Sequence, residues 1–536
     1  MGIPSYFSYI VKNHSNIIKK LTTKQLFPIN NLYLDCNSII YDAAHSLKFD
    51  NLTNYDANAN LIISCVLRKI DEHISLIQPD NFVFIAFDGV APMAKLAQQR
   101  ERRYKSLYQN QISKTIFNDS SATDPWNTTA ITPGTHFMSL LNTQVKEYYK
   151  DPAKYGIKSF IVSASDRFGE GEHKLFDFIR HNPKYHTDLT TVIYGLDADL
   201  IMLCINHLPI CKNIYLFRET PHFIQSINSS LEPNETYLLD IPELARVIAV
   251  DMNNGLPQEM NRTYDYIFLC FFLGNDFMPH FPSVNIRTGG INKMLNAYKA
   301  TIGGTNEILT DGKTIYWKNV KKLVQHLAKS EEDHLKSEMK LRDKRSQQFY
   351  PSDTPENKLK KFDAIPTYER QLEKSINPFK PKWQERYYKA LFKVEIDDTR
   401  RAQISINYLE GLEWTMKYYT SGCPNWQWSY KYSYPPLLED LVEYIPSLDT
   451  VLMENVPPNP ISPLVQLCYV LPKQSLTLLP EPLYEALMSD HPEWYNTNCD
   501  FVWAFCRYFW ESHVELPDID ITELAEFVKI NINRFY

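Results

Sequence analysis

The sequence predicts an α/β fold in which helices flank a mostly parallel central sheet. Short apolar runs, LYLD ending at Asp35, FVFIAFD ending at Asp88 and TVIYGLD ending at Asp197, have the length and composition of buried parallel strands. Stretches with helical periodicity lie between them, such as NLIISCVLRKIDEHISLI at 60–77, and this alternation is typical of βαβ units. With 536 residues, 44% of them hydrophobic, the chain is long enough for a large core.

The composition changes twice along the chain and divides it into three predicted segments. Residues 1–304 hold the α/β alternation, 305–403 are rich in charge and turn formers, and 404–536 are apolar and aromatic. We expect the middle segment to be a helical arm or linker, and the last to be a helical supporting lobe packed on the first. The charged run at 329–348 predicts a helix with a solvated face; RNA contact or a nuclear-import signal is the alternative interpretation.

Charge, cysteine content and hydropathy exclude several classes of protein. The net charge of −7 has the wrong sign for a protein that holds nucleic acid over its whole surface, so any such contact must be local. Nine cysteines without a CxxC pair predict reduced thiols rather than disulfides or a zinc site, and hence a reducing compartment, with the cytoplasm as the default. The longest apolar stretch, 266–274, is shorter than the roughly 20 residues that a membrane helix needs, so no membrane association is expected.

Seven carboxylates in the first 276 residues follow predicted strands or begin a helix. Because the active sites of open α/β sheets form at the carboxyl ends of the strands, we expect these side chains to converge. Clustered acids repel one another unless a cation neutralises them, and hard divalent cations prefer carboxylate oxygens. The pattern therefore predicts a metal-dependent phosphodiesterase whose metal-holding and catalytic residues are Asp35, Asp88, Glu170, Glu172, Asp197, Asp199 and Asp276.

Each acidic motif also has a purely structural interpretation. Asp197 and Asp199 could cap the following helix, although an i, i+2 pair at a strand end points both side chains to one face. Glu170 and Glu172 could simply interact with the positive end of the helix dipole at the start of a helix. The glycines beside them argue against this, because glycine lets the backbone approach a ligand closely. Asp276 could cap a helix in its proline-stiffened loop. The coincidence of all seven acids favours a metal site.

A basic helix face lies just beyond the second apolar run. In KLAQQRERRYK at 95–105, Lys95, Gln99, Arg102 and Arg103 are spaced i, i+4, i+7 and i+8, so they share one side of a helix. Guanidinium groups donate paired hydrogen bonds to phosphate oxygens, and this face therefore predicts a pocket for a terminal phosphate beside the metal site. A plain solvated basic helix is the alternative.

Together, these motifs resemble those of the XRN-type 5′→3′ exoribonucleases. The resemblance covers most of 1–300 and 404–510. The strings that carry it are, in order, MGIPSYF (1–7), LDCNSIIY (34–41), FDGVAPMAKLAQQRERR (87–103), TPGTHFM (132–138), SASDRFGEGEHK (163–174), YGLDADLIML (194–203), LCFFLGNDFMPHFPS (269–283), YLEGLEWTMKYYTSGCPNWQWSYKYSYPP (408–436) and PISPLVQLCYVLP (460–472).

The resemblance implies a core like that of the PIN and flap nucleases, in which the seven acids hold two Mg²⁺ or Mn²⁺ ions for phosphodiester hydrolysis. It also implies that Lys95, Gln99, Arg102 and Arg103 hold a 5′-monophosphate and exclude a cap or a triphosphate by size. The expected substrate is single-stranded, decapped RNA with a 5′-monophosphate, degraded processively to 5′-mononucleotides. Decapping factors are candidate partners, and a monomer is expected.

The chain departs from the family pattern at several points. The family usually has His where this chain has Tyr41, which is expected to stack on the terminal base together with either Trp426 or Trp428. A place in the buried core is the alternative for each tryptophan. Met93 stands where a basic residue is common. The chain ends soon after the second conserved region, so it resembles a short form without the C-terminal extension domains, for which a viral source is one interpretation.

Two other functions fit part of the pattern. A flap-type 5′ DNA nuclease would share the acids and the sheet, but GEGEHK at 169–174 and the region 404–510 argue against it, and 284–330 contains no convincing helix-hairpin-helix motif. A catalytically inactive RNA-binding scaffold would share the fold. The complete set of acids argues against a scaffold, because clustered charge without a use destabilises a fold.

Overall fold

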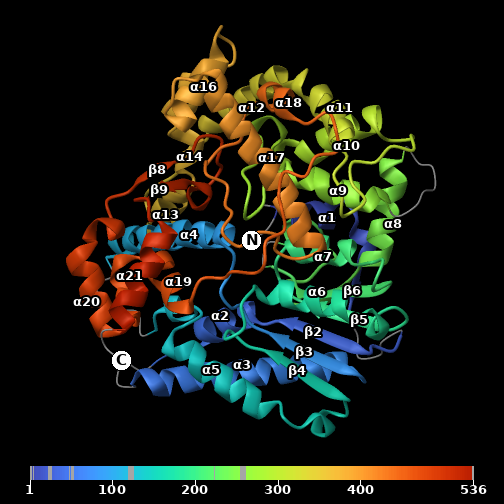
Figure 1. Ribbon diagram of the computed structural model, residues 1–536, viewed down its shortest axis with the longest axis vertical. Helices are drawn as coiled ribbons and strands as arrows, with labels where there is room; N and C mark the ends of the chain where they lie inside the picture. Colours follow the sequence, from blue (N-terminus) through green and yellow to red (C-terminus); the bar gives the residue numbers. More distant parts are fainter. Residues whose placement is uncertain are drawn as a thin grey trace.

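The computed structural model describes the chain except for residues 1–2, 4, 22–26, 48, 50–53, 119–125, 222–223, 254–260 and 534–536. A seven-stranded sheet is formed by β1 (Ile18–Lys20), β2 (Asn31–Asp35), β3 (Phe82–Ala86), β4 (Ser159–Ser163), β5 (Thr190–Tyr194), β6 (Asn213–Glu219) and β7 (Thr236–Asp240). Its spatial order is β1-β7-β6-β5-β2-β3-β4 (Figure 1). The strands from β2 to β6 pair in parallel, whereas β7 and β1 are added antiparallel at one edge. The predicted, mostly parallel sheet is confirmed.

The direction of winding reverses between β2 and β5. The chain adds β3 and β4 on one side of β2, and it adds β6 on the outer side of β5. In a doubly wound sheet such a reversal opens a crevice at the carboxyl ends of the two central strands. Asp35 ends β2, and Asp197 follows closely after β5, which ends at Tyr194, so both acids border this crevice.

Helices cover both faces of the sheet, as predicted. Along β2, Leu32 and Leu34 face one core and Tyr33 faces the other, which is the two-residue repeat of a strand buried on both sides. α2 (Asn37–Ser46), α3 (Tyr55–Ile77) and α5 (His136–Tyr148) form the first core, and α1 (Tyr6–Asn13), α6 (Gly171–His181), α7 (Asp199–Asn206), α8 (Ile241–Met252) and α9 (Asn261–Phe271) contribute to the second. Figure 1 shows α6 and α7 above the sheet and α3 and α5 below it.

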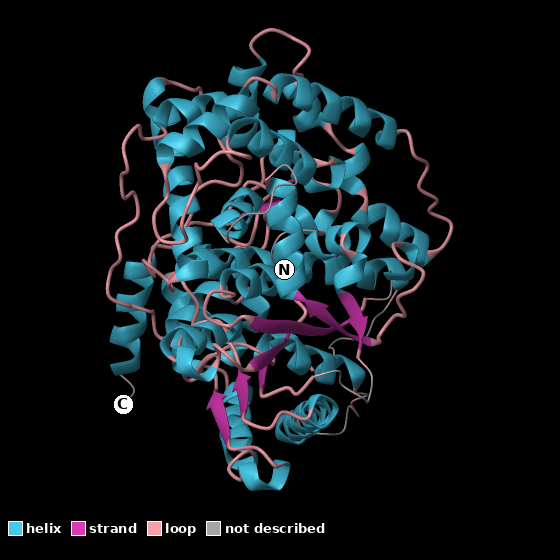
Figure 2. Ribbon diagram, turned by 90° about the vertical axis from the view of Figure 1, so that its right-hand side faces the viewer, coloured by secondary structure: helices cyan, strands magenta, loops and turns pink. Residues whose placement is uncertain are grey.

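The rest of the molecule is mainly helical, and Figure 2 shows the large sheet in the lower half with helices filling the upper half. β8 (Asp500–Val502) and β9 (His513–Glu515) form a short antiparallel pair. The remaining α-helices are α4 (Met93–Phe117), α10 (Gly290–Thr301), α11 (Trp317–Ala328), α12 (Glu331–Ser346), α13 (Pro355–Asp363), α14 (Ile365–Tyr368), α15 (Gln371–Ile376), α16 (Trp383–Phe392), α17 (Asp398–Thr420), α18 (Leu438–Tyr444), α19 (Pro463–Val470), α20 (Glu481–Asp490) and α21 (Ile521–Asn533).

The charged run at 329–348 forms α12, but the prediction of a solvated helix face is only partly right. Glu331, Glu338 and Arg342 are buried. Arg342 Nε donates to Glu373 Oε1 at 2.9 Å, and Arg370 Nε donates to the same oxygen at 2.8 Å. The helix therefore packs into the molecule partly through buried ion pairs, and a count of charges along the sequence cannot reveal such pairs. The predicted segment boundaries at 304 and 403 stay predictions.

One apolar core joins distant parts of the chain. It contains residues from Ile3 to Leu327 together with residues from Tyr408 to Met453, so α17 packs into the same core as α7 and α9. All nine cysteines are unpaired, and seven of them are buried. Among the described residues, no helix combines the length and the apolar character that crossing a membrane requires.

Candidate active site

Two carboxylates at strand ends lie close to the start of α6. Asp35 ends β2 and Asp88 lies just after β3, and the Gly171 amide donates to Asp88 Oδ1 at 2.6 Å. A Cβ atom on Gly171 would lie 2.6 Å from Asp35 Oδ1 and 3.4 Å from Asp88 Oδ1. Only glycine lets the helix approach both carboxylates so closely. Asn37 orients this pair from the other side, because its Oδ1 accepts from the Asp88 amide at 3.0 Å.

Glu170 and Glu172 flank that glycine and are 3% and 7% exposed. Glu170 stands at the N-cap of α6, yet its side chain makes no capping hydrogen bond. Its Oε2 lies 2.6 Å from Lys95 Nζ, and its Oε1 accepts from the Tyr418 hydroxyl at 2.7 Å. The carboxylate is therefore directed into the acidic cluster, and it does not cap α6 through a side-chain hydrogen bond.

The prediction that Asp197 and Asp199 point to one face used a strand repeat that does not extend to either residue. β5 already ends at Tyr194, and α7 begins at Asp199, so the repeat of a strand does not apply to the pair. Asp199 is buried and accepts from the Ile3 amide at 3.2 Å, whereas Asp197 is exposed in the connecting loop. The Asp197 charge nevertheless reaches the cluster, where it contributes to raising the pKa of Asp35.

Lys95 of α4 joins acids from two distant segments. Its Nζ lies 2.6 Å from Glu170 Oε2 and 2.7 Å from Asp276 Oδ2, and all three side chains are buried. Asp276 follows a turn at Gly274, whose φ of 84° favours glycine, in the loop after α9. The ammonium group thus lies between the acids, at the border of the predicted phosphate face.

Burial and mutual repulsion alter the protonation of the carboxyl groups. Burial, followed by the charge of Asp88, raises the pKa of Asp35. Burial, followed by the charge of Glu170, raises the pKa values of both Asp88 and Glu172. Such groups lose their protons readily only when a positive charge is close, so their surroundings favour the binding of a cation.

The pKa values of Asp199 and Asp276 shift in opposite directions. Burial, followed by the charge of Asp276, raises the pKa of Asp199 to about 7. For Asp276 burial acts in the opposite sense, but the Lys95 ammonium prevails and lowers the pKa. Despite its own burial, Lys95 has a raised pKa because Asp276 and Glu170 face it. The cluster therefore already contains one bound positive charge.

The donor atoms of the cluster fit a divalent cation. Two buried carboxylate oxygens, Asp35 Oδ1 and Glu172 Oε2, have no hydrogen-bond partner within the described chain. One atom each of Glu170, Glu172 and His173 lies within 4.8 Å of the other two. A buried carboxylate oxygen without a partner is costly unless a cation compensates it, and carboxylate oxygens are the ligands that Mg²⁺ and Mn²⁺ prefer.

The basic face of α4 continues from Lys95. Gln99, Arg102 and Arg103 are half-buried there. Arg103 Nη2 donates to Thr132 Oγ1 at 2.7 Å, while its buried Nη1 has no partner among the described residues, and burial lowers the pKa of this guanidinium to about 10. The structure places these side chains next to the acids, and their role as a phosphate pocket stays a prediction.

The three predicted stacking residues occupy different surroundings. Tyr41 is half-buried on α2. Trp426 meets the exposed Phe168 edge-on, with 5.2 Å between ring centroids. Trp428 lies stacked on Trp414, with centroids 5.4 Å apart, and packs against the large apolar core. Trp426 is the more buried of the two, at 8% exposed, whereas Trp428 is half-buried, so the core interpretation stays open for each tryptophan.

Sequence reasoning missed two aromatic side chains of α17 that touch the site. The Tyr418 ring stacks on His173 with centroids 3.7 Å apart, and its hydroxyl holds Glu170. Burial, followed by the charge of Asp199, raises the pKa of Tyr419, which lies beside that acid. In the sequence both tyrosines look like ordinary core residues of an apolar helix. His173, which directly follows Glu172, was detectable from its position in the motif.

Comparison with known proteins gives matches along nearly the whole chain. Residues 1–220 match the family described as XRN 5′-3′ exonuclease N-terminus, and residues 259–377 and 357–532 match the Xrn1 helical domain.

Curated proteins with related sequences carry consistent names. The chain is 25% identical to the 5′-3′ exoribonuclease 2 of Arabidopsis thaliana, over 98% of this chain and 67% of that protein. It is 26% identical to the 5′-3′ exoribonuclease 2 homolog of Drosophila melanogaster, over 97% of this chain and 70% of the relative. It is also 26% identical to the 5′-3′ exoribonuclease 1 of Saccharomyces cerevisiae, over 91% of this chain but only 40% of the relative.

Proposed function

The chain belongs to the XRN 5′-3′ exonuclease family and is an exoribonuclease, and we propose that it degrades single-stranded RNA processively from a 5′-monophosphate end. The products would be nucleoside 5′-monophosphates, and the cofactor would be Mg²⁺ or Mn²⁺. The observation that carries this proposal is the meeting of half-buried acids from two strand ends with buried acids from other segments, around carboxylate oxygens without partners among the described residues. Decapped RNA is the proposed natural substrate.

The chemistry divides between the cofactor and the protein. Two divalent cations held by the acids would stabilise the charge on the attacking and the leaving oxygen of the phosphodiester. Asp35, Asp88 and Glu172 would hold these cations, and Gly171 lets α6 come close enough for its two glutamates to take part. Tyr418 fixes the orientation of Glu170 through its hydroxyl group.

Recognition of the 5′ end is assigned to α4. Gln99, Arg102 and Arg103 can donate several hydrogen bonds to one terminal phosphate, and Lys95 connects that face with the acids. The terminal phosphate would then lie beside Lys95, with the first phosphodiester at the acids. A cap or a triphosphate would be excluded because it needs more room than a monophosphate.

Trp426 is the better candidate to stack on the terminal base. Its carbonyl accepts from the amide of Met93, the first residue of α4, at 3.0 Å, so it lies where the basic helix begins. The Trp428 indole donates to Glu410 at 3.4 Å and is stacked on Trp414, so one of its faces is already covered. We assign Tyr41 and Trp426 to the terminal base.

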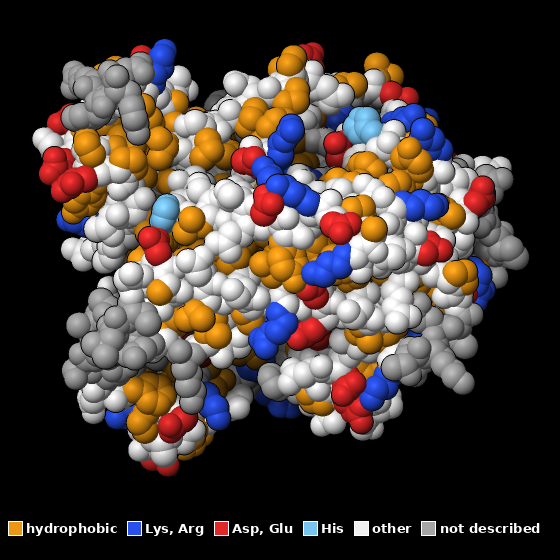
Figure 3. Space-filling view, turned by 90° about the horizontal axis from the view of Figure 1, so that it is seen from below, with side chains coloured by type: hydrophobic (Ala, Val, Ile, Leu, Met, Phe, Trp, Pro, Cys, Tyr) orange, Lys and Arg blue, Asp and Glu red, His pale blue; other side chains and the backbone are white. Residues whose placement is uncertain are grey.

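RNA contact is proposed to be confined to this site. On the face shown in Figure 3, Lys and Arg side chains are interspersed with Asp and Glu, and no large area of one charge is visible. This agrees with the net charge of −7. The nine unpaired cysteines suit a reducing compartment, and we propose a cytoplasmic, monomeric enzyme.

The proposal is tested with matched single-stranded RNAs that carry a 5′-monophosphate, a 5′-triphosphate or a 5′-hydroxyl group. We expect the wild type with Mg²⁺ to release mononucleotides from the monophosphate RNA alone. Asp199→Asn should abolish this activity. Asp333→Asn, the same change at an exposed position of α12, should leave it intact.

Two results would overturn the assignment. Cleavage of flapped DNA but not of RNA would indicate a flap-type nuclease. RNA binding without cleavage under any metal condition would indicate a scaffold.

A further inference from the structure

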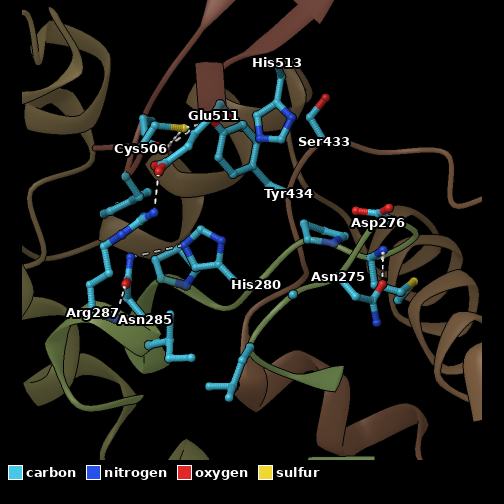
Figure 4. Close-up of a pocket in the computed structure, with 18 of the residues that line it drawn as sticks. Asn275, Asp276, His280, Asn285, Arg287, Ser433, Tyr434, Cys506, Glu511 and His513 are labelled. Atoms are coloured by element: carbon cyan, nitrogen blue, oxygen red, sulfur yellow. Dashed lines mark hydrogen bonds and ion pairs between the residues drawn. The ribbon is translucent and has the colours of Figure 1, made fainter. Parts of the chain in front are cut away.

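A cavity of about 390 Å³ adjoins the active site along Asp276 (Figure 4). Its walls come from residues 273–287, from the residues around Tyr434 and from residues 504–513, while α4 contributes Gln98 and Lys105. Sites for small ligands measure about 300–1,000 Å³, so the cavity has room for one small molecule.

The cavity borders the predicted phosphate face of α4. Gln98 follows Lys95 by three residues, Lys105 follows Arg102 by three, and residues three apart are neighbours on a helix. A smaller cavity of about 190 Å³ shares Gln98, Lys105 and Asp276 with the first one and continues along the same helix. A molecule released from the phosphate face therefore has open space next to it.

Flat rings and a few polar groups line the cavity. Tyr434, Phe505 and the exposed Trp510 line it, and Tyr508 stacks on one face of Trp510, with centroids 4.4 Å apart. The ring of His513 lies edge-on to Tyr434, with centroids 4.9 Å apart. In Figure 4, Ser433 lies beside the rings of His513 and Tyr434. Aromatic faces bind nucleobases by stacking, and they do so for every base.

Lys105 supplies positive charge to the same space. Its Nζ donates to the Ser512 carbonyl at 2.7 Å and makes no ion pair with any described residue, so other donors of the ammonium group stay available. Arg287, by contrast, is paired with Glu511 at 2.6 Å. Burial lowers the pKa of His513 to about 3, so that ring adds no charge near neutral pH. An unpaired cation beside aromatic walls suits a nucleoside phosphate.

A processive 5′→3′ exonuclease needs a separate way out for its product. Hydrolysis leaves a 3′-hydroxyl on the released nucleotide and a new 5′-phosphate on the uncut strand, which still fills the entrance. We propose that this cavity, the product chamber, receives the released nucleoside 5′-monophosphate before the next 5′-phosphate moves onto α4. The inference rests on the proposed exoribonuclease function.

Binding of AMP, adenosine and inorganic phosphate, measured by equilibrium dialysis without RNA, tests the chamber directly. Ser433→Phe should fill the chamber, and Lys105→Met should remove its charge. We expect either change to weaken the chamber's AMP binding about tenfold, as for the loss of one charge-assisted hydrogen bond. Arg102→Ala should remove only AMP bound at the phosphate face. Ser352→Phe, at an exposed loop position, is the matched control.

AMP binding that disappears in Arg102→Ala and is unchanged in Ser433→Phe and Lys105→Met would overturn the proposal. Equal affinities for AMP and adenosine in the wild type would also contradict it. Circular dichroism melts show whether each variant is folded. If Ser433→Phe does not fold, Lys105→Met alone tests the chamber.

Rapid-quench kinetics test the role of the chamber in turnover. With enzyme in excess over RNA, we expect Ser433→Phe to release the first nucleotide at the normal rate and the following ones several-fold more slowly. Equal slowing of the first and later steps, or no slowing at all, would overturn the product role. If the wild type cleaves no RNA, the proposed function fails, whereas dialysis still decides whether the chamber binds nucleotides.

Discussion

Tyr418 joins two parts of the chain that are 248 residues apart, because its hydroxyl donates to Glu170 at 2.7 Å. Groups that orient a metal-holding carboxylate typically change metal affinity or activity by about 10- to 100-fold when they are removed. For Tyr418→Phe we expect a fall of this size in kcat, a higher Mg²⁺ requirement and little change in KM for RNA. Activity titrated with Mg²⁺ measures both effects.

A matched control is Tyr387→Phe, which removes a buried hydroxyl that donates to the Pro435 carbonyl at 2.9 Å. The control should keep the wild-type Mg²⁺ dependence. If both variants lose activity to the same extent without a change in the Mg²⁺ requirement, Tyr418 has only a packing role.

Trp426 and Trp428 should respond differently to removal. A base stacked on an aromatic side chain gains roughly 1–3 kcal/mol, so Trp426→Ala should weaken binding of 5′-phosphorylated RNA about tenfold or more. Trp428→Ala should chiefly lower the melting temperature, because it leaves a gap beside Trp414 in the core. Fluorescence anisotropy and thermal melts compare the two. The opposite pattern would assign the base to Trp428.

The acids of the site could be predicted, but their partners could not. Asp35 and Asp88 follow apolar runs that are recognisable strands, and the carboxyl ends of parallel strands meet at one edge of a sheet. The contact of Glu170 with Tyr418 and that of Lys95 with Asp276 depend on how distant helices pack. No local pattern distinguishes such a tyrosine from a core residue.

Among the elements, α12 combines a polar sequence with a buried position. Its Glu331 is 4% exposed, and both carboxylate oxygens accept from the Leu438 amide, at 3.0 and 2.8 Å. Burial raises the pKa of Glu331 to about 8, from an ordinary value of 4.5. The native state thus holds this proton more tightly than the unfolded chain. This carboxyl therefore lowers the free energy of unfolding as pH rises from about 4.5 to about 8.

Glu331→Gln removes this titration and keeps an oxygen that can accept from Leu438. Relative to the wild type, the melting temperature of the variant should therefore rise between about pH 5 and pH 8. Glu332→Gln, at the exposed neighbouring position, is the control. Thermal melts at constant ionic strength measure the difference, and a shift of the same size at every pH would contradict the assignment to Glu331.

The buried ion pairs around Glu373 should also contribute to the stability of α12. Glu373 is 1% exposed and is paired with Arg342 and Arg370. Breaking a buried pair from one side typically costs roughly 3–5 kcal/mol, because the remaining charges stay desolvated. We expect Glu373→Gln to lower the free energy of unfolding by about this amount in urea titrations. Glu385→Gln, in an exposed pair with Lys382, should cause no measurable change.

The strands of the sheet were easier to predict than the burial of α12. A strand buried on both faces needs an apolar run, and such runs are visible in the sequence. The antiparallel addition of β7 and β1 was not foreseen, because direction in a sheet depends on pairing rather than on composition. The burial of α12 was missed because its buried polar groups have distant partners: Arg342 pairs with Glu373 of α15, and Glu331 accepts from the Leu438 amide.

Over the whole molecule, the nuclease site is completed by the second half of the chain. Phe271 of α9 packs edge-on against Tyr419 with centroids 5.3 Å apart, and Phe277 packs against Trp414 at 5.0 Å. α17 therefore supplies both core surface and the hydroxyl that holds Glu170. An apolar core shared in this way is expected to unfold as one cooperative unit, although the two halves match two family regions.

A proteolytic cut in the exposed loop after α12 tests whether the two halves of the chain form one cooperative unit. Phe349 is 84% exposed there, so a protease site replacing residues 348–353 should be cleaved without unfolding the protein. We expect the two pieces to stay together in size-exclusion chromatography and to retain exonuclease activity, because their contacts are buried rather than carried by the loop. A chain ending at residue 403 should be inactive and poorly soluble, since it lacks Tyr418 and exposes the apolar surface that α17 covers. Separation of the nicked pieces under native conditions, or full activity of the shortened chain, would show that the first half folds and works alone.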